Sequence, residues 1–134
     1  MKKIGYKIET KNNSIEISPG NKLKPTNIKT GPYPNFATDN MPLMLAVLTT
    51  IIGKSKIEET IFSNRFMAAP ELNRLGAKIR VKKDVALISG SRNFKGAQVM
   101  ASDLRASISL VLAALSAEGQ TVINRVYHLD RGYE

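Results

Sequence analysis

The sequence predicts a mixed α/β (α+β) fold built from repeated helix–strand–strand–helix–strand units. Three features predict it: an internal repeat, two apolar stretches of helix length, and short runs of β-forming residues. Residues 1–18 and 72–89 align without gaps at an offset of 71, and they share Gly, Lys, Ile, Lys, Ile and Ser at matching positions. The 134 residues are therefore expected to hold about two copies of the unit, about 1–71 and about 72–134, with the second copy truncated.

Each copy opens with the end of a helix that closes at a glycine, Gly5 in the first and Gly76 in the second. Glycine suits this position because it adopts the left-handed backbone conformation without a steric penalty. A strand that begins Lys-Ile follows, and a polar turn (12–13 or 83–84) leads into a second strand that ends at serine. We expect a β-hairpin in each copy.

A longer apolar helix comes later in each copy, over residues 38–52 and 102–117. The first opens with Thr-Asp and the second with Ser-Asp, which are good N-cap residues. Both helices are expected to stop at glycine, Gly53 and Gly119, and to lead into the β-rich runs KIEETIF and TVINRVY. Helices of this composition are buried, so we expect them to cover one face of a sheet.

Composition excludes several classes of protein. The chain is 43% apolar and 23% charged, which is ordinary for a globular domain. No window approaches the roughly 18 uninterrupted apolar residues of a membrane span, and the basic start lacks the apolar stretch of a secretory signal. The absence of cysteine excludes a disulfide framework, a zinc ribbon and a thiol nucleophile within these residues.

The chain is strongly basic. Its 13 lysines and 7 arginines face 11 acidic residues, for a net charge of +9. Such an excess predicts an anionic partner, which is a nucleic acid, a phosphorylated metabolite or an acidic membrane surface. The alternative is a solvated basic surface that serves only solubility. The chain has no dense run of Lys and Arg and no aromatic–basic interleaving of the kind that recognises RNA.

Four segments resemble the family of UDP-N-acetylglucosamine 1-carboxyvinyltransferases, which are enolpyruvyl transferases. The segments are GPYPNFATD (31–39), ETIFSNRFMAAPELNRLGA (59–77), KGAQVMASDLRASISLVLAALSAEGQTVI (95–123) and YHLDRGYE (127–134). The resemblance covers essentially the whole chain. It implies a longer protein of two lobes, each an inside-out α/β barrel of three repeated units, of which this chain carries about two from the C-terminal region.

The resemblance also implies a reaction. The family transfers the enolpyruvyl group of phosphoenolpyruvate to the 3-hydroxyl of UDP-N-acetylglucosamine and releases phosphate, the first committed step of peptidoglycan synthesis. The route is addition–elimination through a tetrahedral intermediate, and it needs neither a metal nor an organic cofactor. We therefore expect an enzyme of the bacterial cytoplasm that binds these two substrates and neither nucleic acid nor membrane.

Two acidic residues match family positions. The resemblance implies that Asp39 is the catalytic aspartate, which binds the sugar 3-hydroxyl and takes or relays its proton. A carboxylate serves as such a base when a closed, poorly hydrated site raises its pKa. Asp103 matches another acid of the family, which either orients an arginine or helps proton transfer. From the residues alone, a role as a helix cap explains Asp39 and Asp103 equally well.

Three arginines match the family's binding site. The resemblance implies that Arg105 and Arg131 clamp the carboxylate of phosphoenolpyruvate, and that Arg65 lies near the reacting phosphate and carboxylate. The planar guanidinium suits this role because it donates two parallel hydrogen bonds to such groups. Arg105 is also expected to need a partner, since it lies inside an apolar helix. The alternative for Arg65 and Arg131 is a surface salt bridge, to Glu71 or Asp130 for example.

Two further positions complete the expected site. The resemblance implies that the backbone carbonyl of Ile61 contacts the sugar nucleotide. His128 is the only histidine, and we expect it to pack against neighbours rather than carry a proton.

The family's reactive Cys (or Asp) loop, an N-terminal Lys-Asn pair and much of the uridine pocket fall outside these residues. We therefore expect little or no transferase activity from this chain alone. An apolar surface is expected to be exposed where the third repeat should pack, so that the isolated piece dimerises or aggregates, and the expected protein partner is a second copy or the missing N-terminal lobe. A split or truncated gene product is a related interpretation. The alternatives are a fragment of the shikimate-pathway enolpyruvyl transferase and a basic nucleic-acid-binding module without catalytic activity.

Overall fold

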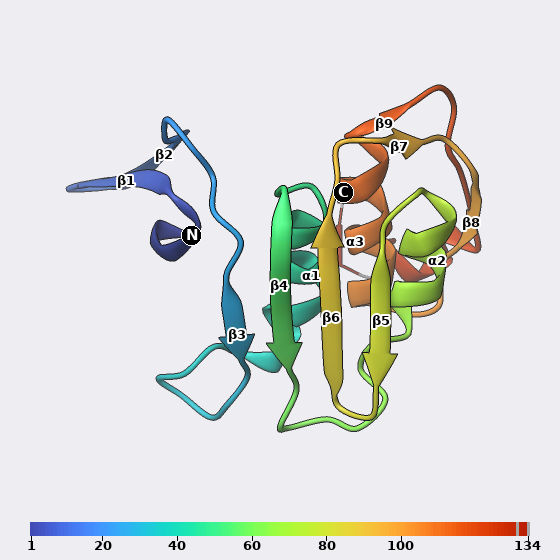
Figure 1. Cartoon of the computed structure of the whole chain (residues 1–134), viewed down its shortest axis with the longest axis horizontal. Coiled ribbons are helices and arrows are strands. Elements are labelled where there is room, and N and C mark those ends of the chain that lie inside the picture. The colour runs from blue at the N-terminus through green and yellow to red at the C-terminus, as the bar shows by residue number, and fades with distance from the viewer. Residues whose placement is uncertain (131, 134) are drawn as a thin grey trace.

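The computed structural model describes residues 1–130 and 132–133 and has mixed α/β architecture (Figure 1). Four strands form the main sheet in the order β3-β4-β6-β5, and the helices lie together against one face of this sheet. The helices are α1 (Met41–Thr49), α2 (Ala68–Arg74) and α3 (Leu104–Ala114), with 3-10 turns at η1 (Lys2–Ile4), η2 (Thr38–Asn40) and η3 (Val126–His128). The strands are β1 (Tyr6–Lys11), β2 (Ser14–Pro19), β3 (Asn27–Lys29), β4 (Gly53–Glu58), β5 (Ile79–Lys82), β6 (Val85–Gly90), β7 (Phe94–Lys95), β8 (Gln98–Met100), β9 (Ala117–Glu118) and β10 (Val122–Asn124).

The main sheet joins the two repeats. Strands β3 and β4 come from the first repeat and pair in parallel, with α1 as the crossover between them. Strand β4 then pairs antiparallel with β6, which forms a hairpin with β5 in the second repeat. The expectation that the helices cover one face of a sheet is confirmed, since α1 packs on β6 and α2 packs on β5.

The repeat is visible in the hydrogen bonds as well as in the sequence. Strands β8 and β10 pair in parallel around α3, as β3 and β4 do around α1. The amide of Lys24 donates to the carbonyl of Ile4 at 2.8 Å, and at the offset of 71 the amide of Lys95 donates to the carbonyl of Leu75 at 3.0 Å. The prediction of repeated units in a mixed α/β fold is therefore confirmed.

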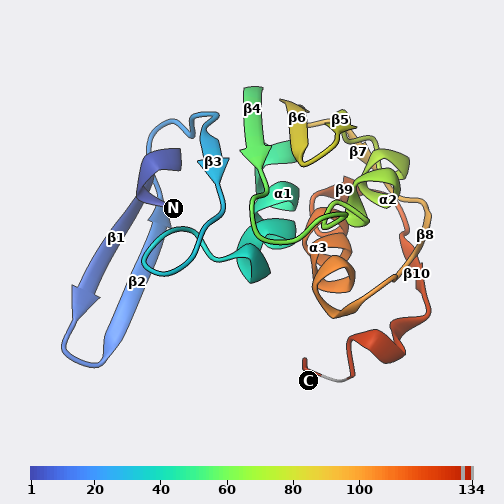
Figure 2. The same ribbon diagram turned by 90° about the horizontal axis from the view of Figure 1, so that it is seen from below.

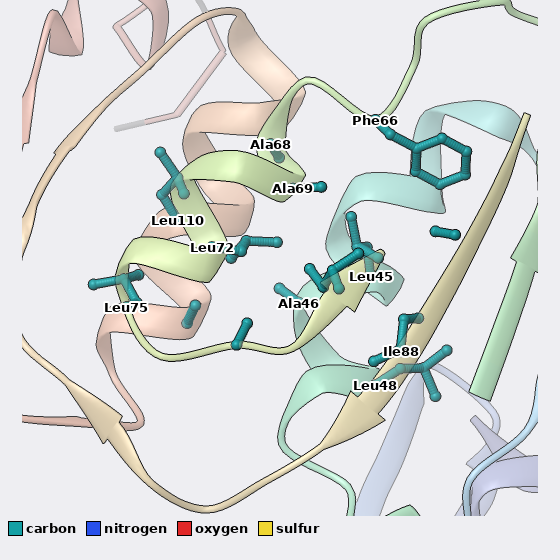
Figure 3. Packing of buried hydrophobic residues seen from close by; sticks show 14 of the residues in the cluster. Leu45, Ala46, Leu48, Phe66, Ala68, Ala69, Leu72, Leu75, Ile88 and Leu110 are labelled. Atoms are coloured by element: carbon teal, nitrogen blue, oxygen red, sulfur yellow. The ribbon is translucent and has the colours of Figure 1, made fainter. Parts of the chain in front are cut away.

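The core lies between the sheet and the helices. Leu45 and Leu48 of α1, Leu72 of α2 and Leu110 of α3 are fully buried, and Ile88 of β6 meets them from the sheet (Figure 3). Full burial of one such side chain contributes about 1.5–3 kcal/mol to folding. This shared core holds α1 and α3 side by side, which places the starts of the two helices at the same end of the molecule.

The first hairpin has an apolar face that the described residues leave open. Strands β1 and β2 project away from the main sheet (Figure 2). Ile15 and Ile17 of β2 are 66% and 53% exposed, whereas Ala86 and Ile88, at the matching positions of β6, are buried. The same register is therefore covered by helices in the second repeat and uncovered in the first.

The predicted ends of the two long helices are wrong. Helix α1 ends at Thr49, where the amides of Thr50 and Ile51 bond to the carbonyls of Val47 and Leu48, at 3.1 and 3.3 Å, in a tight turn. Gly53 instead begins β4 with a φ of 128°.

Helix α3 also stops before its glycine. It ends at Ala114, where the amide of Ser116 bonds to the carbonyl of Ala113 in a tight turn. Gly119 follows β9.

The strands also differ from expectation. The run KIEETIF is a strand only as far as Glu58, and the run TVINRVY is a strand only over Val122–Asn124. The two- and three-residue strands β3, β7, β8 and β9 have no alternating pattern long enough to predict them. In the residues that the structure describes, no helix combines the length and the apolar character that a membrane span requires.

We predict that Gly76→Ala destabilises the fold more than Gly119→Ala. Both glycines have positive φ, 97° and 84°, so each alanine carries the left-handed penalty of about 1–2 kcal/mol. A Cβ at position 76 also lies 2.8 Å from the carbonyl oxygen of Asn93, whereas a Cβ at position 119 meets nothing within 4 Å. Urea denaturation of the two variants measures the difference, and equal losses would contradict the predicted close approach.

Candidate functional site

Asp39 is the centre of the candidate site. It lies in η2, immediately before α1, and its side chain is 54% exposed. A terminal nitrogen of Arg65 donates to its Oδ1, and a terminal nitrogen of Arg105 donates to its Oδ2 at 2.6 Å. The structure thus brings together three of the predicted site residues, which come from three separate segments of the chain.

Asp39 does not cap α1, although Thr38 and Asp39 were expected to do so. The N-cap position is Asn40, and no side chain forms a capping hydrogen bond there. The Thr38 hydroxyl donates instead to Oε2 of Glu59 at 2.9 Å. The cap interpretation of Asp39 is therefore wrong, because its two oxygens are occupied by arginines.

Asp103 caps the start of α3 and thereby fixes the backbone of Arg105. Its Oδ1 accepts hydrogen bonds from the amides of Arg105 and Ala106, at 2.9 and 3.0 Å. The capping interpretation of Asp103 is confirmed. Arg105 lies in the first turn of the helix, and its side chain is 36% exposed with Asp39 as the partner that burial in an apolar helix requires.

Arg65 lies in the loop after β4 and is more enclosed than Arg105, at 19% side-chain exposure. Its guanidinium carbon lies 5.0 Å from the centre of the Phe62 ring, a cation–π arrangement. The alternative of a surface salt bridge from Arg65 to Glu71 is wrong. Arg65 pairs with Asp39, and Glu71 accepts from the amide of Met100 and lies near Arg74. The buried Nε of Arg65 has no hydrogen-bond acceptor among the described residues.

The two arginines lower the pKa of Asp39. The hydrogen bond from Arg105 lowers the pKa of the Asp39 carboxyl most, and the charges of both arginines and the bond from Arg65 add to this against a smaller effect of burial. The carboxylate is half exposed and paired with both arginines, so the closed, poorly hydrated surroundings that raise the pKa of a catalytic base are not formed by these residues. Asp39 is an anion at neutral pH, and the three side chains together carry a net charge of +1.

Sequence reasoning did not single out Glu59. This residue directly follows β4 and is 3% exposed, yet it is an acid. The sequence signal that points to it is its place at the start of the ETIF segment, between a strand and a predicted substrate contact at Ile61. The amide of Ile61 donates to Oε1 of Glu59 at 2.8 Å, so Glu59 sets the position of the Ile61 backbone.

The remaining predicted residues lie near the C-terminus. Arg131 falls outside the described residues. His128 is partly buried in η3, and its ring packs against that of Tyr127 with the centroids 4.2 Å apart.

Comparison with known families gives the class of protein to which this fold and this cluster belong. The chain belongs to the EPSP synthase family, because the family model described as EPSP synthase (3-phosphoshikimate 1-carboxyvinyltransferase) matches residues 1–134.

Individual relatives within this family carry the name of a particular enzyme. The chain is 54% identical over 134 residues to the UDP-N-acetylglucosamine 1-carboxyvinyltransferase of Pelagibacter ubique, covering 100% of this chain and 32% of that one. It is 53% identical over 131 residues to the enzyme of the same name from Helicobacter pylori, covering 98% and 31%.

A solved structure agrees with these relatives. The enolpyruvyl transferase NikO from Streptomyces tendae superposes with a TM-score of 0.89 at 29% identity, over 98% of this chain and 31% of that one. The chain therefore spans about a third of the length of the proteins it matches.

We predict that Arg105→Ala raises the pKa of Asp39 back toward 3.8, its ordinary value. The bond from Arg105 is the largest cause of the lowered pKa, so its removal has a larger effect than removal of a distant charge. Carbon-13 NMR of the carboxyl group measures the pKa, and Arg80→Ala, an exposed arginine of β5, is the matched control. Equal effects of the two substitutions would contradict the direct pairing.

The same pairing predicts a pH dependence of stability. The folded-state pKa of Asp39 lies below its unfolded value, so the pair stabilises the fold above about pH 3.8 and loses this effect as the pH falls through the folded-state pKa. Chemical denaturation between neutral and acidic pH measures the loss, which is expected to be smaller in Arg105→Ala. An identical pH dependence in the two proteins would contradict this linkage.

Proposed function

We propose that this chain supplies one side of the active site of an enzyme that transfers the enolpyruvyl group of phosphoenolpyruvate to the 3-hydroxyl of UDP-N-acetylglucosamine. The observation that carries the proposal is the pairing of Asp39 with Arg65 and Arg105, a carboxylate base between two cations. The names of relatives at about 50% identity support the choice of this reaction over the shikimate-pathway transfer.

The arginines bind the anionic substrate in this proposal. Phosphoenolpyruvate carries a carboxylate and a phosphate, both of which accept paired hydrogen bonds from guanidinium. Arg65 has a buried Nε without an acceptor among the described residues, so it has a donor available for such a group. We propose the same role for Arg131, which the resemblance assigns to the carboxylate clamp.

Asp39 acts on the sugar hydroxyl in this proposal. The 3-hydroxyl oxygen bonds to C2 of phosphoenolpyruvate while its proton passes to Asp39, and the C2=C3 double bond is lost as C3 takes up a proton from a group outside these residues. In the second step C3 loses a proton, the double bond re-forms, and the bond from C2 to the phosphate oxygen breaks and releases inorganic phosphate. When substrate anions draw the guanidinium groups of Arg65 and Arg105 away, Asp39 loses the partners that lower its pKa. Its basicity then rises in the complex, where a proton acceptor is needed.

The chain carries only part of this site, since it spans about a third of its relatives. We propose that an N-terminal lobe or a second copy of the chain completes it, that the protein works in the bacterial cytoplasm, and that neither nucleic acid nor membrane is its partner. Ile61 and Phe62 are 46% and 55% exposed, which leaves contact surface for the part of the site that lies outside this chain.

We predict that phosphoenolpyruvate binds weakly to the isolated chain and perturbs the side-chain NMR signals of Arg65 and Arg105. Loss of one charge-assisted contact in Arg105→Ala weakens binding by about 10-fold or more, whereas Arg80→Ala leaves it unchanged. An NMR titration measures both affinities. Equal binding to the two variants would overturn the assignment of the clamp.

Substrate identity and completeness are tested separately. UDP-N-acetylglucosamine is expected to perturb the amides of Ile61 and Phe62 where shikimate 3-phosphate does not, and the reverse result favours the shikimate-pathway alternative. Phosphate release by the isolated chain with both substrates is expected to be negligible. Turnover at the rate of a full-length relative would contradict the claim that the site is partial.

A further inference from the structure

Glu59 has surroundings that are unusual for an acid. It is 3% exposed and accepts four hydrogen bonds of 2.8–3.1 Å. The donors are the hydroxyls of Thr30 and Thr38 and the amides of Ile61 and Phe62. Burial raises the pKa of Glu59, but these four bonds outweigh it and hold the pKa below its ordinary value, so the group is an anion. A buried and fully bonded carboxylate of this kind fixes every segment that donates to it.

The donors belong to three segments that meet at the candidate site. Thr30 follows β3, Thr38 precedes Asp39, and Ile61 and Phe62 lie in the loop that carries Arg65. Thr30 also links the ends of the two parallel strands, because its hydroxyl accepts from the amide of Thr60 at 2.8 Å and its carbonyl accepts from the Thr60 hydroxyl at 2.7 Å.

The second repeat shows that the fold itself does not require this acid. The amide of Thr30 donates to the carbonyl of Glu58, and at the matching place the amide of Ala101 donates to the carbonyl of Asn124. The residue after Asn124, which corresponds to Glu59, is the exposed Arg125. The equivalent strand pair of the second repeat therefore forms without a buried carboxylate. The role of Glu59 is therefore specific to the first repeat.

We propose that Glu59 is a positioning residue that joins the Asp39 turn to the loop of Ile61 and Arg65, so that the base and the arginine stay in contact before substrate arrives. This inference rests on the proposed function for its catalytic meaning. Its structural content, the coupling of Glu59 to Asp39 through Thr38, is independent of any substrate.

The test uses two threonines at opposite ends of α1. Thr38→Val removes the hydroxyl that bonds to Glu59, and Thr50→Val removes a hydroxyl that bonds to the carbonyl of Val47. Both substitutions make the same chemical change, and neither residue is part of the proposed catalytic set. The readout is the pKa of Asp39 by carbon-13 NMR without ligand, which a purely local loss of stability does not move.

We expect Thr38→Val to raise the pKa of Asp39 toward its ordinary value and Thr50→Val to leave it unchanged. Affinity for phosphoenolpyruvate should fall about fivefold in Thr38→Val, the factor for one hydrogen bond. An unchanged pKa of Asp39 in a folded Thr38→Val variant overturns the positioning role.

The two proposals fail in different ways. If phosphoenolpyruvate does not bind the unaltered chain but the pKa responds as expected, the proposed function fails and the role of Glu59 stands. If phosphoenolpyruvate binds through Arg105 but the pKa does not respond, only the role of Glu59 is lost.

Discussion

The packing of α1 against α3 is the contact on which the candidate site depends. The two helices hold equivalent places in the two repeats, and the apolar residues they share with the sheet keep them side by side. Their starts therefore meet, and Asp39 contacts Arg105 although 66 positions separate them in the chain. An ion pair that is half exposed contributes little to stability by itself, so the core positions the pair rather than the reverse.

The site combines a shared plan with local departures from it. Each repeat presents the end of a parallel strand pair and the start of a helix at the same edge, a common location for ligand sites in α/β folds. The second repeat places Asp103 and Arg105 there, and the first places Asp39 and the buried Glu59. The pairing of an acid with a cation at this edge depends on the difference between the two repeats. Two identical helix starts would place side chains of the same charge next to each other.

The repeat, both hairpins and the existence of the long helices could be predicted from the sequence, because each is marked by a repeated pattern of residues or by a glycine. It also named Asp39, Arg65 and Arg105 through a family resemblance. Their mutual contact could not be predicted, since no local pattern encodes a pairing between residues 39, 65 and 105. The helix ends were wrong because tight turns of the backbone close α1 and α3 before their glycines, and Glu59 was missed because its burial depends on donors from three segments.

Asp39 is held between two arginines in the absence of substrate. NMR of the arginine side chains, with detection of scalar coupling through the hydrogen bond, measures this contact. We expect slowed rotation of the Arg65 and Arg105 guanidinium groups and a coupling from an Arg105 terminal nitrogen to the carboxyl carbon of Asp39 at neutral pH. Freely rotating guanidinium groups with averaged signals, like that of the exposed Arg80, and no coupling to Asp39 would contradict it.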